Sequence, residues 1–486
     1  MKKSKYCIFL LMALIFPLCG YLIQNNLNNL NRDIKLAAPD YDAREYIGLG
    51  SSELRDGLTG DGVNVAVIDT GIDADHEAFI SLGERITYFD VVENETIPED
   101  NDGHGTWVAS ILGGNSLVYK GVAPDINFTI IRAFFEEDGE KVSNIGLISD
   151  AVDIILEKQE ELSIRITSMS FGIESASRQI SNILNSIVGQ LVDNNILAIA
   201  AAGNDGDGGL GTIQPPASSE KVLAVGGVYY DGEPWPLSSK GPSYDHKIKP
   251  DVCAPAVNIE GASASTFFTN RYTTGSGTSA STPFISGLAA LMLEKDNDLT
   301  ALELKSIISF TSYRTIDPRT IKDNIQGWGI IQGYAALDAL DSSIEINSNS
   351  NFAFTLNESQ PVLCLPIRTS GLNNLFMQLN QLESAEAEMY LFDTQPDEAG
   401  NPQLLTHSIS TFEPYDTLNR IGISSFDSHN YYLMIKLVHG TGSGDFSLVM
   451  VMEYRLSLFL IIVGINLLGL VFIGFQYKKF LKIEVR

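Results

Sequence analysis

The stretch Gly275-Ser276-Gly277-Thr278-Ser279-Ala280-Ser281-Thr282-Pro283 decides how the rest of the chain is interpreted. Its glycine-rich turn leads into small hydroxyl residues and then into the apolar run 284–293, a pattern typical of a tight turn that enters a buried helix. A serine there faces the positive end of the helix dipole and unpaired backbone N–H groups. That setting suits a nucleophile whose substrate develops negative charge on an oxygen. The alternative is a loop whose serine or threonine caps the helix.

The composition limits the classes of protein that this chain can belong to. A length of 486 residues with 44% hydrophobic residues predicts two or three domains with a substantial core. The formal net charge of −28 disfavours nucleic acid as a partner, because phosphates would be repelled. The acidity indicates a solvated surface, with bound Ca²⁺ as the alternative. Cys253 and Cys364 are expected to be buried free thiols, and a bridge between them is the alternative.

Both ends of the chain carry apolar runs beside basic residues. Three lysines precede an apolar run near the start, so residues 1–23 are predicted to be a signal peptide or signal anchor. Segment 456–475 has the length of one membrane-spanning helix, and the basic tail 476–486 follows it. By the positive-inside tendency this tail is cytoplasmic. We therefore predict a single-pass C-terminal anchor in the cell membrane with the preceding domains outside the cytoplasm; a buried C-terminal helix is the alternative.

Apolar runs rich in β-branched residues alternate with helical stretches through the first two thirds of the chain. Strands are predicted at 63–68, 128–133, 164–169, 196–202 and 222–228. Strands alternating with helices imply a mainly parallel sheet with helices on both faces, an α/β fold. From about residue 343 the pattern changes to short alternating segments separated by turns, which is typical of a small all-β sandwich.

Four polar residues fall at strand or helix ends of the α/β region. Asp69 ends a predicted strand, His104 opens a helix between two glycines, and Asn204 follows another strand. Ser279 would attack a carbonyl, His104 would take its proton, and Asp69 would orient the imidazole. Asn204 would donate its amide to the oxyanion beside the backbone N–H of Ser279. The four residues together therefore favour acyl transfer.

Four motifs resemble those of the subtilisin-like serine proteases, or subtilases, and occur in the family's order. They are Val67-Ile68-Asp69-Thr70-Gly71-Ile72, Gly103-His104-Gly105-Thr106, Ala201-Ala202-Gly203-Asn204 and Gly277-Thr278-Ser279-Ala280-Ser281-Thr282-Pro283. The resemblance covers about 40–342. It implies a catalytic triad of Asp69, His104 and Ser279, with Asn204 as oxyanion donor and no cofactor for the chemistry. Trp107 departs from the family pattern, since many members have a second histidine there.

The resemblance also implies how substrate would bind. Ser170, Phe171 and Gly172 would pair with the substrate backbone as an added strand. Ala202 and Gly203, within the segment 201–203, would form the other wall of the primary specificity pocket, and Gln214 would lie near its base. Many relatives bind structural Ca²⁺, and a solvated acidic loop is the alternative use of the acidic residues that could hold it here. Those residues are Glu93, Glu95, Glu99, Asp100 and Asp102.

We predict a membrane-anchored, extracytoplasmic serine endopeptidase that acts on protein or peptide substrates through an acyl-enzyme. The predicted organisation is a signal segment at 1–23, a polar spacer at 24–46, a subtilisin-like catalytic domain at 47–342, a β-sandwich at 343–454 resembling the small domain appended to secreted peptidases, a transmembrane helix at 456–475 and a tail at 476–486. One alternative is a surface binding or adhesion protein with an inactive protease domain. A metal hydrolase is the other, with its ligands drawn from Asp69, Asp73, Asp75, His76 and His104.

Overall fold

The chain forms two compact units, which we describe separately. The computed structural model describes residues 43–50, 57–137, 140–174, 177–264, 271–316, 320–346, 349–369, 373–381, 385–408, 419–425, 428–438 and 442–454. The first unit comprises Met1–Glu294 with Asp323–Gly327, and the second comprises Lys295–Lys322 with Trp328–Arg486. The predicted signal segment 1–23, and the spacer 24–46 up to residue 42, lie outside the described residues.

A seven-stranded parallel sheet organises the first unit. Its strands lie in the order β2-β3-β1-β6-β7-β8-β9, and every neighbouring pair is parallel. Their bounds are β1 (Asn64–Asp69), β2 (Ile86–Asp90), β3 (Asn127–Arg132), β6 (Ile164–Met169), β7 (Leu197–Ala201), β8 (Leu223–Val228) and β9 (Val252–Pro255). Strands β1, β7 and β8 are buried at every residue. Burial on both faces explains their continuous apolar sequences, as in other parallel sheets.

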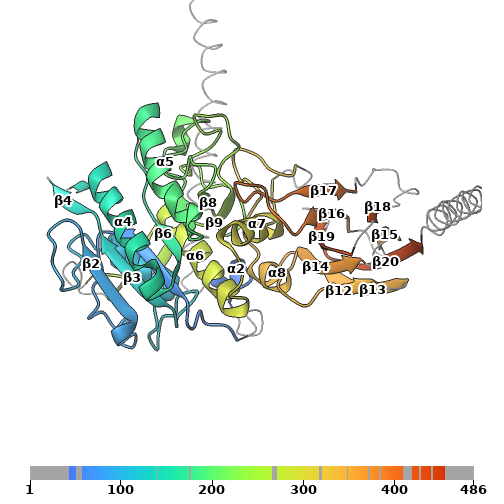
Figure 1. Cartoon of the computed structure of the whole chain (residues 1–486), viewed down its shortest axis with the longest axis horizontal. Coiled ribbons are helices and arrows are strands. Elements are labelled where there is room, and N and C mark those ends of the chain that lie inside the picture. Colours follow the sequence, from blue (N-terminus) through green and yellow to red (C-terminus); the bar gives the residue numbers. More distant parts are fainter. Residues whose placement is uncertain are drawn as a thin grey trace, which may run out of the picture. The chain divides into compact units, whose positions relative to one another are not determined.

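Helices cover this sheet and link its strands. They are α2 (Ala43–Tyr46), α3 (His104–Gly113), α4 (Ile145–Leu162), α5 (Arg178–Asp193) and α6 (Thr278–Lys295). Helices α4 and α5 lie side by side (Figure 1), and they pack against β1, β6 and β7. Their N-termini are capped by the side chains of Asn144 and Ser177, which accept backbone N–H bonds. Helix α6 is buried almost along its whole length, so it lies in the core of the unit.

The remaining elements of the first unit are short. Two are the 3₁₀ helices η1 (Gly83–Arg85) and η2 (Gly206–Gly208). The others are two antiparallel strand pairs: β4 (Phe135–Glu137) pairs with β5 (Glu140–Val142), and β10 (Ile259–Ala262) pairs with β11 (Tyr272–Gly275). Strand β11 leads directly into the turn that begins α6. Strands β1, β6 and β7 are neighbours in the sheet, so the residues that follow their carboxyl ends meet at one edge.

Two sheets sharing one core form most of the second unit. The strands of the first sheet lie in the order β12-β14-β19-β16-β17, and those of the second in the order β13-β20-β15-β18. Among the described strand pairs of this unit, β12 and β14 are parallel and the others are antiparallel. Their bounds are β12 (Ile344–Ile346), β13 (Ser350–Leu356), β14 (Val362–Thr369), β15 (Asn373–Gln381), β16 (Ala387–Asp393), β17 (Leu404–His407), β18 (Asn419–Ser425), β19 (His429–Leu437) and β20 (Gly444–Tyr454). Met377 on β15 and Leu433 on β19 belong to the same buried cluster, consistent with the predicted β-sandwich.

Two helices belong to the second unit as well. They are α7 (Ala301–Thr311) and α8 (Gly333–Asp338). The ring of Phe310 on α7 lies 5.1 Å from that of Phe392 and 4.9 Å from that of Tyr432, so α7 packs on the sheet that contains β16 and β19. Thr300 and Glu303 form a reciprocal capping box that starts α7.

The predicted C-terminal transmembrane helix, and the cell-membrane localisation derived from it, are contradicted. Segment 456–475 lies outside the described residues. Among the helices of the described part, none combines the length and the apolar character needed to cross a bilayer. The two longest, α4 and α6, have 18 residues each; α4 carries charged residues along its exposed face, and α6 carries hydroxyl residues in its first turns.

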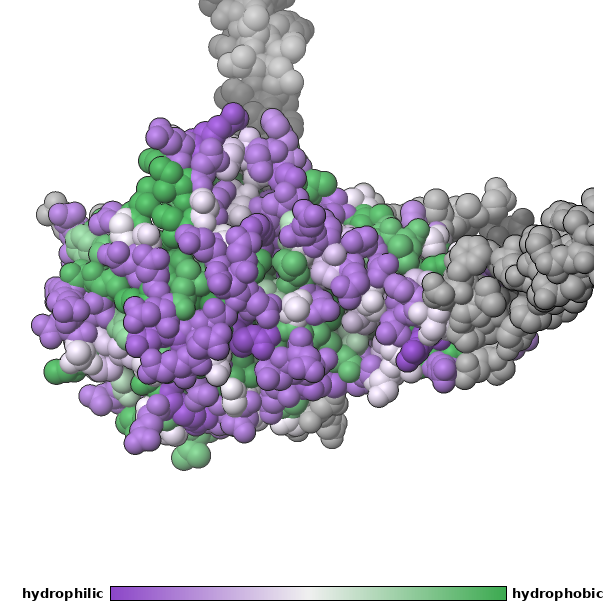
Figure 2. Space-filling model, viewed as in Figure 1, coloured by the Kyte–Doolittle hydropathy of each residue, from purple (hydrophilic) through white to green (hydrophobic). Residues whose placement is uncertain are grey.

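Both cysteines of the described residues, Cys253 and Cys364, are buried and free, which confirms that prediction. The face seen in Figure 2 is covered mainly by hydrophilic residues, with small apolar patches between them. Since acidic residues outnumber basic ones by 60 to 32, much of the polar surface of the chain carries negative charge at neutral pH.

Candidate active site

A buried carboxylate and an imidazole form the centre of the site. Asp69 ends β1, and His104 is the first residue of α3. The Nδ1 atom of His104 lies 2.7 Å from Oδ1 of Asp69, which also accepts the backbone N–H of Thr70 at 2.8 Å. Burial alone would raise the pKa of Asp69, but the charge and hydrogen bond of His104 outweigh it, so this pKa lies below its ordinary value. An ionised Asp69 holds the proton on Nδ1 and leaves Nε2 able to accept one.

Asp100 joins the Asp69 segment to the helix that carries His104. Its Oδ1 atom accepts the hydroxyl of Thr70 and the backbone N–H of Gly103, both at 2.8 Å. Its Oδ2 atom accepts the backbone N–H of Thr106 at 2.7 Å and the Thr106 hydroxyl at 2.6 Å. Gly103 has φ 91°, which favours glycine, and no side chain of its own caps the helix. The Asp100 carboxylate therefore serves as the cap.

This role of Asp100 was missed in the sequence, where the residue was grouped with the calcium candidates. A buried carboxylate with four accepted hydrogen bonds has little capacity left for a metal. The available signal was its position shortly before the start of a helix, where acidic side chains accept orphan N–H groups.

Ser279 lies in the first turn of α6 and contacts the end of β6. Its hydroxyl donates to the carbonyl of Ser170 at 2.9 Å, and the Ser170 hydroxyl donates to the carbonyl of Ser279 at 3.0 Å. Because a hydroxyl has a single hydrogen, Ser279 must leave Ser170 before it can donate to an imidazole. Catalytic hydrogen bonds often form only when substrate is bound.

Asn204 follows β7, and hydrogen bonds join its side chain to Thr278, the residue before Ser279. Its Oδ1 atom accepts the backbone N–H of Thr278 at 3.0 Å and the Thr278 hydroxyl at 3.1 Å. Because Oδ1 is used in this way, the amide Nδ2 is the end that remains a donor.

The residues predicted to contact substrate also lie at this edge of the sheet. Ser170, Phe171 and Gly172 follow β6, and Ala202 and Gly203 follow β7, its neighbour. The Thr278 hydroxyl lies 3.2 Å from both N and O of Gly203, which attaches this segment to the start of α6. Adjacent strand ends thus bring together segments that are far apart in sequence.

The alternative metal site of the sequence analysis is not favoured by the geometry. His76 donates from Nε2 to the carbonyl of Arg271 at 2.6 Å, and its Nδ1 accepts the backbone N–H of Ala78 at 3.1 Å. Both ring nitrogens are therefore engaged in protein hydrogen bonds. Burial lowers the pKa of His76 below its ordinary value, so the ring is neutral at pH 7.

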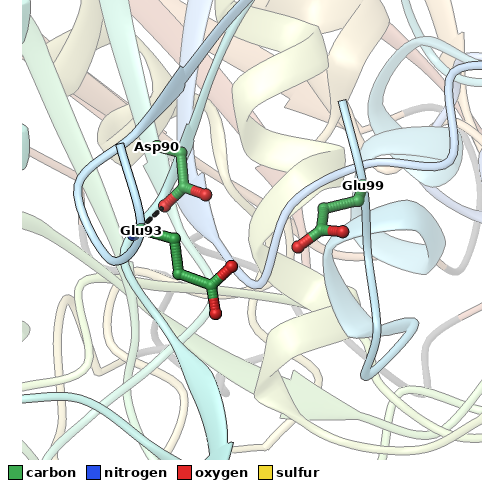
Figure 3. Close-up of side chains that lie close together, drawn as sticks. All are labelled: Asp90, Glu93 and Glu99. Carbon is green, nitrogen blue, oxygen red and sulfur yellow. Dashed lines mark hydrogen bonds between the residues drawn. The ribbon is translucent and has the colours of Figure 1, made fainter. Parts of the chain in front are cut away.

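Two of the residues named as calcium candidates, Glu93 and Glu99, come together with Asp90. Asp90, Glu93 and Glu99 approach one another, with ligand atoms within 4.8 Å (Figure 3). The guanidinium of Arg132 lies among them, at 2.9 Å from Asp90, 3.5 Å from Glu93 and 2.6 Å from Glu99. A fixed positive charge already occupies the place among these carboxylates where a cation would bind, so we assign no metal to them. The calcium expectation stays a prediction without a site.

A parallel α/β fold that carries a buried Asp–His pair and a helix-start serine at one sheet edge is that of a serine protease. Comparisons with known proteins agree. The chain is 31% identical to serine protease AprX of Bacillus subtilis over 334 residues, covering 62% of this chain and 72% of AprX. It is 28% identical to subtilisin Savinase of Lederbergia lenta over 282 residues, covering 58% of this chain and 92% of Savinase.

The chain belongs to the subtilase family, whose sequence profile matches residues 60–329. Among solved structures, a lanthipeptide protease has a TM-score of 0.51 at 19% identity, covering 62% of this chain and 94% of that one. That likeness shows a shared fold. Family membership confirms the predicted subtilisin-like serine protease and implies protein or peptide substrates.

Proposed function

We propose that this subtilase is an endopeptidase that cleaves peptide bonds through a triad of Asp69, His104 and Ser279. The observation that carries the proposal is the 2.7 Å contact between His104 and buried Asp69 at the end of β1. The neighbouring strand β6 is followed by Ser170, whose carbonyl accepts the hydroxyl of Ser279. Each position of the triad holds a residue able to do its task. This disfavours the alternative of a binding protein with an inactive protease domain.

The proposed reaction begins with the substrate backbone beside residues 170–172. The Ser279 hydroxyl leaves the Ser170 carbonyl and attacks the substrate carbonyl while Nε2 of His104 takes its proton. Asp69 stabilises the resulting imidazolium, which then gives the proton to the leaving amine. Water attacks the acyl-enzyme by the same route, and Ser279 is released.

Asn204 is proposed to stabilise the tetrahedral intermediate. The bonds from Thr278 to its Oδ1 orient the Nδ2 donor before substrate arrives, so little reorganisation is needed. The backbone N–H of Ser279 at the start of α6 is the proposed second donor. Removing one such donor typically costs about 10²–10³ in kcat.

The test compares Ser279→Ala with Ser276→Ala. Ser276 lies in the same turn, is exposed, and accepts a bond from the backbone of Asn258. We expect Ser279→Ala to lose hydrolysis of a dye-labelled unfolded protein and labelling by a fluorophosphonate, while Ser276→Ala keeps both. Full hydrolysis by correctly folded Ser279→Ala would disprove the mechanism.

A further inference from the structure

Gln214 occupies the space between the two segments proposed to line the primary specificity pocket. A Cβ atom added at Gly172, after β6, would overlap the Oε1 atom of Gln214. A Cβ atom added at Gly203, after β7, would lie 2.5 Å from its Cδ atom. The amide therefore lies directly against both backbones and fits only because both residues lack a side chain. Gln214 itself is buried, with 7% of its surface exposed.

Hydrogen bonds hold Gln214 in this position. Its Nε2 atom donates to Oδ2 of Asp205 at 2.6 Å, and its backbone N–H donates to the carbonyl of Ala202 at 2.9 Å. The backbone N–H of Ile173 donates to the carbonyl of Pro215 at 3.1 Å, which ties the next residue to the opposite segment. A bond to a carboxylate is stronger than one between neutral groups. Displacing the side chain would therefore break a charge-assisted, partly buried hydrogen bond.

We propose that Gln214 is a specificity-determining residue that shortens the primary pocket. This inference rests on the proposed function. The P1 residue of a substrate is the residue whose carbonyl Ser279 attacks. Glycine, alanine and serine at P1 fit above the Gln214 amide. Leucine, phenylalanine and tyrosine must displace it from Asp205. The substrate class is therefore extended peptide with a small P1 side chain.

The test uses quenched fluorescent peptides that differ only at P1, with alanine, leucine or phenylalanine. For the wild-type chain we expect kcat/KM for alanine to exceed that for phenylalanine by roughly tenfold or more, the discrimination that a pocket contact usually gives. In Gln214→Ala this ratio should fall roughly tenfold, mainly because phenylalanine is cleaved faster. Gln190→Ala is the matched control, since Gln190 is exposed on α5 and its amide donates a hydrogen bond to Ile187 of the same helix.

Two further measurements keep the inference testable if Gln214→Ala folds poorly. Asp205→Ala removes the carboxylate that anchors the Gln214 amide. The ratio of kcat/KM for the alanine peptide to that for the phenylalanine peptide should therefore lie between the wild-type ratio and the Gln214→Ala ratio. Mass spectrometry of an unfolded protein digested by the wild-type chain should show small residues at most P1 positions. A majority of large P1 residues, or an unchanged ratio in folded Gln214→Ala, would overturn the proposal. Retained hydrolysis in Ser279→Ala would instead refute the proposed function.

Discussion

At the scale of single residues, the site depends on carboxylates that have different tasks. Asp69 is aimed at His104 and stays ionised because that partner outweighs the effect of burial. Asp100 contacts neither His104 nor Ser279 through its side chain among the bonds of the described residues, yet it positions both ends of the Asp69–His104 pair. The first is proposed to act in the chemistry, and the second is a positioning residue.

Replacing Asp100 by asparagine tests this division. One of its oxygens becomes an N–H₂ donor facing groups that also donate, so the start of α3 should shift and His104 with it. We expect kcat to fall by about 10- to 100-fold, as for other small misplacements of catalytic groups, with little change in KM. Asp75→Asn, at an exposed position, is the control. An equal fall in both variants, or a change confined to KM, would contradict the positioning role.

The four residues of the proposed triad and oxyanion site could all be found in the sequence, because each follows a strand or opens a helix within a recognisable motif. The hydrogen-bond partners could not. Whether Asp100 binds a metal or caps a helix depends on distances among Thr70, Gly103 and Thr106, which no spacing rule supplies. The same holds for Arg132, whose guanidinium reaches the carboxylates of Asp90 and Glu99 across neighbouring segments.

At the scale of elements, α3 is fitted closely against the β10–β11 hairpin. The indole of Trp107 on α3 lies against Gly261 on β10 and Gly275 on β11. A Cβ atom at Gly275 would lie 2.7 Å from Cζ2 of Trp107. Strand β11 then leads into the turn before Ser279. The tryptophan that departs from the family pattern is thus accommodated by glycines on both strands of the hairpin.

Gly275→Ala should destabilise this contact. We expect the free energy of unfolding to fall by about 1–3 kcal/mol through overpacking, and Trp107→Leu should restore part of it in the double variant. Gly189→Ala on α5 is the matched control, because its nearest neighbour, Lys221 Cδ, is 3.8 Å away and alanine favours a helix. Urea unfolding in the Ser279→Ala background measures all of these. Equal effects of both glycine substitutions would count against the account.

His76 connects the segment after β1 to the start of β11 and should make this connection sensitive to acid. Burial lowers the folded-state pKa of His76, and the charge of Arg271 lowers it further; the hydrogen bond to the Arg271 carbonyl and the charges of Asp73 and Glu77 oppose this without cancelling it. The unfolded state then binds more protons than the folded state between the folded-state pKa and about pH 6.5, so stability is lost as the pH falls through this window.

We expect the free energy of unfolding of the Ser279→Ala chain to decline with a slope of up to about 1.4 kcal/mol per pH unit from this residue below about pH 6.5. In His76→Gln, whose amide can still donate to the carbonyl of Arg271, that part of the slope should disappear. Urea unfolding at a series of pH values checks this. Parallel pH curves for the two proteins would show that His76 does not contribute.

At the scale of the whole molecule, five strands of the parallel sheet were predicted in their order along the chain, whereas β2 and β9 at its two edges were not. The change to β structure after about residue 343 was visible in the loss of helical periodicity. The order of strands within each sheet was not, because pairing such as β1 between β3 and β6 is set by packing between distant segments. The predicted transmembrane helix was wrong: it was placed from the length, the apolar character and the basic flank of segment 456–475, and no helix of the described residues has the length and apolar character needed to cross a membrane.

The net charge of −28 gives a prediction for the full chain. Excess like charge destabilises a compact state, and salt screens it over about 8 Å at 0.15 M instead of about 30 Å at 0.01 M. The melting temperature of the Ser279→Ala chain at pH 7 should therefore rise between these two NaCl concentrations. The rise should shrink near pH 4.5, close to the sequence pI. A fall in melting temperature with salt at pH 7 would be inconsistent with dominant self-repulsion.

The most direct test of the central claim is where a fluorophosphonate attaches. The proposed mechanism predicts one adduct per chain, mapped by peptide mass spectrometry to the peptide that contains Ser279 and to that side chain. The adduct should be absent in Ser279→Ala, be formed much more slowly in His104→Ala, and abolish proteolysis when complete. An adduct on Ser281 or another serine, or full proteolysis by a completely labelled chain, would contradict the account.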